Sequence, residues 1–337
     1  MDDVAPRFAQ GIARRSFLIG SALAPFAPAL ANAQASGASA WPTRPVALII
    51  PFPAGGAMDV LGRGVAENLA DKLGQPFVVD NRVGAAGNIG AMAAAKAPPD
   101  GYTILMAGAS SLALNKFMFA TMPYDPEQEL TPIVLVSKLP HIFVVSAKVE
   151  ARTLKALVAY AKANPGKLNA GVPGAGTTAH ITLEAFMAET GAKMTVVTYR
   201  AEPQMLTDLV GGQLDFACTL TTSPGPHVQA GRLRALAVTS AVRTQQLPDV
   251  PTVEQAGYPG FEATAWFALA APTGTPKEII DRISATVNAF ISSDRGKQDL
   301  SKLDSLPAGG TPEATKVFIA AEVRKWGPII KAANIRM

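Results

Sequence analysis

The sequence predicts an α/β protein with mainly parallel sheets, and three observations lead to this prediction. Segments with the apolar pattern of strands alternate with segments of helical spacing through most of the chain. The strand-like segments are short, unbroken apolar runs, which is typical of strands buried on both faces. Turns rich in glycine and proline separate the segments, as expected of repeated βα units.

The first part of this alternation covers residues 46–107. Val46–Ile50 is an apolar run between prolines and predicts a strand. Apolar residues at helical spacing over 60–73 predict a helix that ends at Gly74. The pattern then predicts a strand over 77–79, a helix over 89–97 and a strand over 102–107.

The second part predicts five helices and five strands. The helices are expected over 153–163, 177–190, 202–210, 276–291 and 312–332, and the strands over 168–171, 196–199, 214–217, 235–239 and 265–270. In parallel sheets, ligands bind at the carboxyl ends of strands, where loops lead into helices. We therefore expect a functional site in the loops that follow strands.

Residues 1–33 have the features of a cleaved export signal. Paired arginines at 14 and 15 precede an apolar stretch over 17–30, and the A-N-A sequence ending at Ala33 fits a signal-peptidase site. The apolar stretch is shorter than the roughly 20 residues that a membrane span requires. We expect a periplasmic protein cleaved near Ala33, without a membrane anchor. Export by the twin-arginine or the Sec route is open.

Composition argues against several classes of protein. The 337-residue chain has a formal charge of +4, and removal of residues 1–33 leaves 304 residues with a charge of +3, which is room for two domains. This charge, without any Lys/Arg run, predicts no nucleic-acid partner. The single cysteine, Cys218, and three histidines without metal-ligand spacing predict no metal or cofactor. No catalytic constellation is recognisable, so we expect no enzyme. A hydrolase that uses Cys218 or a serine is an alternative.

The loop after the first strand is the first candidate site. Gly55 and Gly56 permit close approach of a ligand, and the free N–H groups of the following helix start attract anions. An ordinary strand-to-helix turn is the alternative. The candidate ligand-binding residues here are Phe52, Ala54, Gly55, Gly56, Ala57, Met58 and Asp59, of which Asp59 could instead cap the helix or brace the loop.

A second glycine-rich loop lies between the strand at 168–171 and the helix at 177–190. A hydroxyl of Thr177 or Thr178 can donate to a carboxylate while capping the helix. His180 follows in the first turn, as a ligand contact or as a structural hydrogen-bonding group. The candidates are Gly174, Ala175, Gly176, Thr177 and His180.

Two further segments lie at the same predicted edge. Glycines at 84, 87 and 90 have the spacing G-x-x-G-x-x-G rather than that of a dinucleotide site, and predict a turn and helix start beside the cleft. Ser110, directly after the strand at 102–107, is close enough to the strand end to reach a ligand.

These loops and several other motifs resemble the substrate-binding proteins of tripartite tricarboxylate transporters, the Bug family. The matching segments cover nearly all of the chain after the export signal: WPTRP at 41–45, PFPAGG at 51–56, NRVGAAGNIG at 81–90, PDGYT at 99–103, PYDP at 123–126, LRALAVTS at 233–240 and LPDVPT at 247–252. The resemblance implies a two-lobed, type II-like periplasmic binding protein (Venus flytrap) with two crossover hinge segments, near 137–141 and 240–247. It places lobe 1 at 41–138 and 245–337 and lobe 2 at 139–244, with one ligand carboxylate held by both glycine loops.

Two departures from the family pattern concern specificity. Many relatives have Ser-Thr where this chain has Ala57-Met58, and Phe-Asp-Asn where it has Cys218-Thr219-Leu220. Loss of the acidic and amide side chains removes a partner for a ligand ammonium group. The hypothesis is therefore a dicarboxylate or aromatic acid without an amine, in contact with Met58, Thr219, Leu220 and an aromatic side chain at 266 or 267. The alternative is that these side chains face the core.

The resemblance implies a solute-binding protein, expected to be monomeric, that delivers a small carboxylate to inner-membrane transporter subunits. A ligand-presenting sensor for a membrane kinase would have the same binding chemistry and is the alternative function.

Overall fold

The computed structural model describes residues 41–337. The predicted export signal, with its cleavage near Ala33, lies outside the described residues. The strands are β1 (Val46–Ile50), β2 (Phe77–Asn81), β3 (Thr103–Gly108), β4 (Leu130–Ser146), β5 (Asn169–Val172), β6 (Thr195–Thr198), β7 (Phe216–Leu220), β8 (Leu233–Val238), β9 (Thr264–Pro272) and β10 (Leu306–Pro307). The helices are α1 (Ala57–Leu73), α2 (Asn88–Ala95), α3 (Asn115–Met118), α4 (Leu154–Ala163), α5 (Thr178–Thr190), α6 (Glu202–Gly211), α7 (Gly225–Gln229), α8 (Lys277–Ser292), α9 (Asp294–Lys302) and α10 (Pro312–Ala332).

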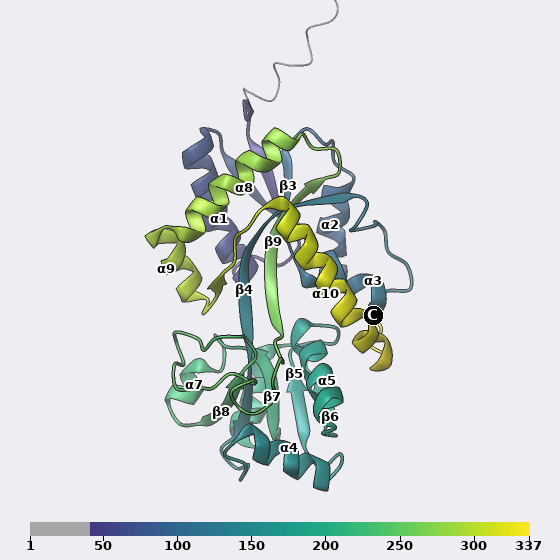
Figure 1. The fold of residues 1–337 in the computed structure, drawn as a ribbon, viewed down its shortest axis with the longest axis vertical. Helices are drawn as coiled ribbons and strands as arrows, with labels where there is room; N and C mark the ends of the chain where they lie inside the picture. Colours follow the sequence, from purple (N-terminus) through teal and green to yellow (C-terminus); the bar gives the residue numbers. More distant parts are fainter. Residues whose placement is uncertain (1–40) are drawn as a thin grey trace, which may run out of the picture. The chain divides into compact units, whose positions relative to one another are not determined.

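Two sheets share the long strand β4 (Figure 1). The first has the order β2-β1-β3-β9-β4, and the second continues as β4-β7-β5-β6, with β8 and β10 also paired to β4. The pairings β1–β2, β1–β3, β5–β6 and β5–β7 are parallel, whereas every pairing of β4 and β9 is antiparallel. The α/β fold is confirmed, but the prediction of mainly parallel sheets is wrong at the centre, because β4 and β9 run against the βα units that flank them.

Strand β4 exchanges partners along its length. Ser137 and Lys138 pair with β10, whereas His141 and Ile142 pair with β7 and β8. This exchange supports a first crossing between the lobes at the interval 138–141. Since the sequence pattern contains Pro132, Pro140 and Lys138, which are unfavourable in a central strand, β4 was not among the predicted elements.

The segment that follows the second predicted crossing, at 240–247, packs on the second sheet. Val253 bonds to the β8 residue Val238, and the rings of Phe261 and Phe143 pack against each other with centroids 6.4 Å apart. Residues 247–263 therefore stay with the core of the second sheet. We place the second crossing at 263–264, where β9 begins, and keep both lobe boundaries as a proposal.

Helix α1 illustrates how the sequence determines an element. Its buried residues Met58, Leu61, Val65 and Leu69 lie on one face, and it ends at Gly74, whose φ of 77° only glycine adopts readily. The helix begins at Ala57 rather than at the predicted residue 60, because Gly56 is an extended N-cap. This earlier start brings the first-turn amides to the carboxyl end of β1.

The core of the second sheet is an aromatic cluster around Phe143. Its ring lies 4.7 Å from that of Phe186 and 5.4 Å from that of Phe216, and all three side chains are buried. Replacement of Phe143 by Ala is expected to lower the free energy of unfolding by about 3–5 kcal/mol through lost burial and the cavity left behind. Urea denaturation followed by circular dichroism measures it. The exposed Tyr160→Ala on α4 is the control, expected within about 0.5 kcal/mol of the parent. A loss below 1 kcal/mol for Phe143→Ala would contradict the assigned core.

Candidate functional site

A pocket of about 570 Å³ lies where strand ends of both sheets meet. A volume of this size is typical of small-molecule sites. Its lining comes from the loops after β1, β2, β3 and β5, from the first turns of α1, α5 and α6, from β4, from the end of β7 and from the start of β9: Phe52, Pro53, Gly56, Ala57, Met58, Ala86, Gly108, Ala109, Ser110, His141, Pro173, Ala175, Gly176, Thr177, Thr178, Ala179, Glu202, Thr219, Leu220, Ala265, Trp266 and Phe267. The predicted candidates Ala54, Gly55, Asp59, Gly174 and His180 are not among them.

The N-terminus of α1 forms one side of the pocket. Gly56 is its N-cap and receives no side-chain cap, so the first-turn amides have no partner within the helix. Gly56, Ala57 and Met58 all line the cavity. The unpaired N–H groups and the positive end of the helix dipole therefore face the space where a ligand would lie.

Asp59 holds this loop from behind. Its carboxylate accepts hydrogen bonds from the backbone N–H of Gly55 at 2.9 Å, from the side-chain amide of Asn81 at 2.9 Å and from the guanidinium of Arg63 at 3.0 Å. Burial raises the pKa of Asp59, but these hydrogen bonds outweigh it and lower the pKa to about 2. Asp59 is a positioning residue, and the predicted alternative of a loop brace describes its contacts.

The N-terminus of α5 lines the same pocket from the second sheet. Thr177 caps this helix, since its hydroxyl accepts from the His180 amide at 3.3 Å and donates to the Gly174 carbonyl at 3.0 Å. The hydroxyl proton is thus already used. The predicted hydroxyl donation to a ligand by Thr177 or Thr178 stays a prediction, and the Thr177 hydroxyl would have to leave the Gly174 carbonyl to make it.

His180 lies behind the second loop. Its Nδ1 accepts from the Gly176 amide at 3.1 Å, and its Nε2 is 3.6 Å from a carboxylate oxygen of Glu184. The acceptor role of Nδ1 leaves the proton on Nε2. Of the two predicted roles of His180, these contacts support the structural one.

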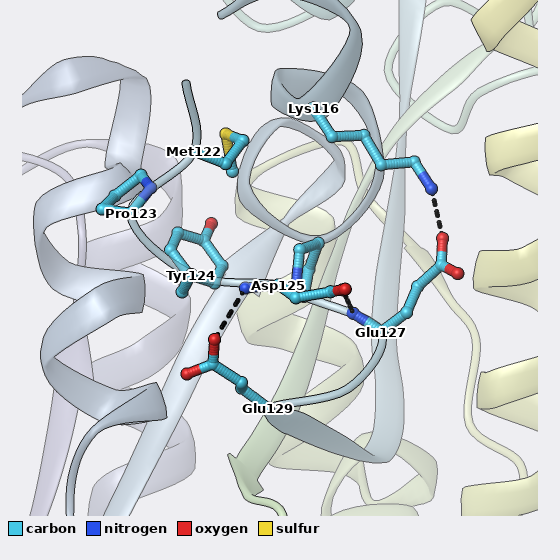
Figure 2. A pocket seen from close by; sticks show the side chains of 8 residues that line it. Lys116, Met122, Pro123, Tyr124, Asp125, Glu127 and Glu129 are labelled. Carbon is cyan, nitrogen blue, oxygen red and sulfur yellow. Dashed lines mark hydrogen bonds and ion pairs between the residues drawn. The ribbon is translucent and has the colours of Figure 1, made fainter. Parts of the chain in front are cut away.

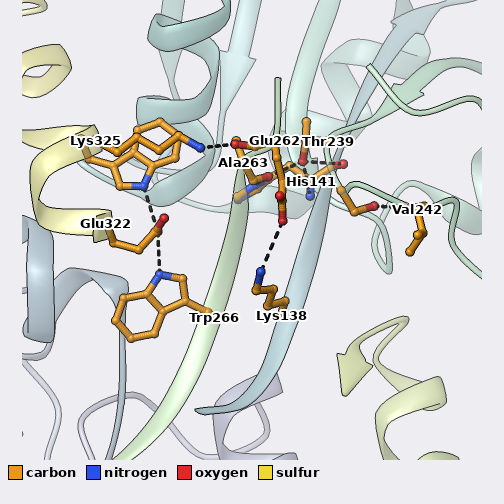
Figure 3. A network of polar contacts seen from close by, with 11 residues as sticks. Lys138, His141, Thr239, Val242, Glu262, Ala263, Trp266, Glu322 and Lys325 are labelled. Atoms are coloured by element: carbon orange, nitrogen blue, oxygen red, sulfur yellow. Dashed lines mark hydrogen bonds and ion pairs between the residues drawn. The ribbon is translucent and has the colours of Figure 1, made fainter. Parts of the chain in front are cut away.

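His141 is a lining residue that sequence reasoning missed. Its Nδ1 lies 3.3 Å from the Ala263 carbonyl, which can only accept, so Nδ1 carries the proton (Figure 3). Nε2 must then accept from the Thr178 hydroxyl at 3.0 Å. Burial lowers the pKa of His141 to about 4, so this imidazole is neutral at physiological pH.

Part of the lining is apolar and includes Met58, Leu220 and Phe267. The indole N–H of Trp266 donates to Glu322, which also accepts from the indole N–H of Trp326, both at 2.9 Å (Figure 3). Trp266 is fully buried, and its ring packs against that of Phe318 on α10 with centroids 5.4 Å apart, so its side chain belongs to the core.

Glu202 is the second lining residue that sequence reasoning missed. It opens α6, directly after β6, and its carboxylate accepts a hydrogen bond from the buried Thr219 hydroxyl. Glu202 therefore brings an acidic side chain to the pocket from a neighbouring element. Its position after a parallel strand is the sequence signal that could have identified Glu202 as a candidate site residue.

The turn containing Ala86 completes the lining. Ala85 and Ala86 have φ of 47° and 52°, in the left-handed region that favours glycine. The buried Asn115 supports this turn, donating to the Ala86 carbonyl at 3.1 Å and to Asn88 at 2.7 Å. Ser110 lines the pocket, as predicted from its place after β3.

A second hollow, around Tyr124, is lined by several charged side chains (Figure 2). Its carboxylates already have partners: Glu127 pairs with Lys116, and Glu129 accepts from the Asp125 amide at 3.0 Å and pairs with Lys96. These interactions stabilise a surface turn and leave no group arranged to hold an anion there.

Within residues 41–337 we also considered a reactive cysteine, a metal site and a membrane-spanning helix. Cys218 is buried, and burial raises the pKa of its thiol, so it is not a reactive thiolate. The described residues contain no group of three His, Cys, Asp or Glu placed to hold a metal ion. None of the described helices has the length and apolar character needed to cross a membrane.

Comparison with known proteins identifies the family. The profile of the tripartite tricarboxylate transporter family receptor matches residues 61–335. The chain belongs to this receptor family. Protein BugT of Bordetella pertussis is 36% identical over 303 residues, covering 89% of this chain and 92% of BugT.

Two solved receptor structures share the fold. R. palustris Rpa4515 with adipate has 38% identity and a TM-score of 0.76, covering 88% of this chain and 99% of that one. MatC from Rhodopseudomonas palustris with bound malate has 27% identity and a TM-score of 0.72, covering 86% of this chain and all of that one. The two-lobed binding-protein fold is thus confirmed, and the receptor family consists of non-enzymatic solute-binding proteins that bind carboxylates.

The buried His141 predicts a pH dependence of this receptor's stability. Its pKa falls from 6.5 to about 4 on folding, so the unfolded chain binds the proton more readily. Stability from the neutral imidazole is complete above pH 6.5 and declines as the pH falls towards 4, by about 2 kcal/mol between pH 7.5 and 5. The free energy of unfolding of the parent and of His141→Gln would be measured at pH 7.5 and at pH 5. Between these pH values the parent should lose about 2 kcal/mol more than the variant does. An equal change in the free energy of unfolding for both proteins would show that His141 is not a neutral buried group.

Proposed function

We propose that this protein is a periplasmic receptor that captures a small organic carboxylate and delivers it to a tripartite tricarboxylate-type membrane transporter. The observation that carries the proposal is the convergence of the α1 and α5 N-termini on one pocket. Two helix starts provide converging N–H donors for a single anion without any basic side chain. Relatives solved with adipate and with malate support the same ligand class.

The proposed ligand contacts are backbone groups of the two loops. Ala57 and Met58 would donate from one lobe, and Ala175, Thr177 and Thr178 from the other. A carboxylate bridging both lobes would stabilise a closed arrangement, so the ligand shifts an open–closed equilibrium towards the form that the membrane partner binds. The apolar lining residues Met58, Leu220 and Phe267 support a ligand with an aliphatic or aromatic body.

The proposed location follows from the predicted export signal over residues 1–33. The protein would act after cleavage, as a monomer without a membrane anchor, and its partners would be the small acid and the transporter subunits.

A thermal-shift screen of the chain from residue 34 onward tests the ligand class. Mono-, di- and tricarboxylates, aromatic acids and amino acids would be compared at equal concentration. A ligand at about 100 times its dissociation constant adds roughly 2.7 kcal/mol of stability, which is a readily measured rise in melting temperature. The proposal fails if no carboxylate raises it.

Replacement of Ala57 by Pro tests the role of the α1 amides. Proline is tolerated at the first position of a helix, and the extended Gly56 (φ −75°, ψ 166°) is compatible with a following proline. The change removes one N–H donor while keeping the helix. Loss of one hydrogen bond to a charged ligand is expected to weaken binding about 10- to 100-fold, measured by calorimetry.

Asp294→Pro is the matched control for Ala57→Pro. It occupies the first position of α9, after the extended N-cap Ser293 (φ −73°, ψ 160°) and away from the pocket. We expect unchanged affinity in this variant. Unchanged affinity in Ala57→Pro as well would remove α1 from the binding site.

A further inference from the structure

The pocket has one ionisable acid, Glu202, and no lysine or arginine among its described lining residues. His141 also lines it, but is neutral because burial lowers its pKa to about 4. The positive end of the pocket is therefore formed by helix dipoles and N–H groups, whereas its one full charge is negative. A ligand must satisfy both features.

The position of Glu202 follows from the topology of the second sheet. Strands β5, β6 and β7 are parallel, so the loops that follow them meet at one edge. Glu202 follows β6, the second glycine loop follows β5, and Thr219 lies near the end of β7. The carboxylate thus shares the pocket with the second glycine loop but belongs to a different element.

The Glu202 carboxylate is incompletely satisfied by protein groups. Thr219 donates one hydrogen bond to it, and the side chain is only half-buried. An ionised carboxylate has about four acceptor positions, so it can accept further donors from the cavity. An anionic ligand group at the same place would instead be repelled.

We infer that Glu202 determines specificity at the far end of the ligand: the receptor selects acids whose second functional group donates a hydrogen bond, as an ammonium or hydroxyl does, over acids with a second ionised carboxylate. The inference rests on the proposed capture of one carboxylate by the two helix N-termini. It names the chemical class of the ligand as an amino- or hydroxy-substituted monocarboxylic acid.

Glu202 has another contribution that the test must separate. As an acid in the first turn of α6, it also interacts favourably with the helix dipole. Loss of that interaction would change the stability of the protein with every ligand alike. Only an effect on ligand selection would produce different changes for different far-end groups.

The experiment compares ligands of equal length that differ only at the far end. One series is adipate, 6-aminohexanoate, 6-hydroxyhexanoate and hexanoate, and a second contains the four-carbon equivalents, so that ligand length is also covered. Dissociation constants come from calorimetry on the chain from residue 34 onward. In at least one series the amino or hydroxy acid should bind about tenfold or more tighter than the diacid.

Glu202→Gln removes the charge but keeps a hydrogen-bond acceptor. We expect binding of the amino acid to weaken and that of the diacid to strengthen, each by about tenfold, with little change for the hydroxy acid. Glu189→Gln, at an exposed position on α5, removes the same charge outside the pocket and should leave the ranking unchanged.

Each outcome separates the inference from the function on which it rests. A diacid that binds tightest in the parent protein, with a ranking that Glu202→Gln does not alter, overturns the inference while leaving carboxylate capture intact. Absence of binding by every acid in both series, and in the broader carboxylate screen, overturns carboxylate capture itself.

Discussion

The rest of the structure depends on one constraint: the N-termini of α1 and α5 must face a common space. These helices lie on different sheets, and among the described strands β4 alone belongs to both. Strand β4 pairs with β9 along its first part and with β7 and β8 along its last. Strand β4 therefore joins the two sheets and fixes the direction from which each helix start approaches the pocket.

The groups behind the pocket are arranged so that the converging amides stay available. Asp59 binds the Gly55 amide, His180 binds the Gly176 amide, and Thr177 caps its own helix. Each loop is thus held by hydrogen bonds on the side away from the cavity. Since the donors are positioned before any ligand arrives, binding an anion requires little reordering of these loops, which favours affinity.

Sequence reasoning located the loops but not the long strand that orients them. The βα units could be predicted because short apolar runs, glycine stops and helical spacing are local signals, and α5 ends at Gly191 and α6 at Gly212 as such signals require. Strand β4 could not, because Pro132 and Pro140 lie within one continuous strand whose two parts belong to different sheets. Its continuity depends on pairing with β9, a contact between residues more than 120 positions apart.

The same distinction between local and distant contacts explains which residues of the candidate site could be predicted from the sequence. The backbone lining at Gly56, Ala57 and Ala175 followed from strand ends and glycines, whereas the roles of Asp59 and His180 depend on which neighbour receives each hydrogen bond. His141 was missed because its partner carbonyl, Ala263, lies 122 residues away. Glu202 differs from these cases, because its place after β6 satisfied the rule already used for the glycine loops. A carboxylate at a strand end should be weighed with the same rule as a glycine loop, since a binding site is defined as much by the charge it disfavours as by the donors it provides.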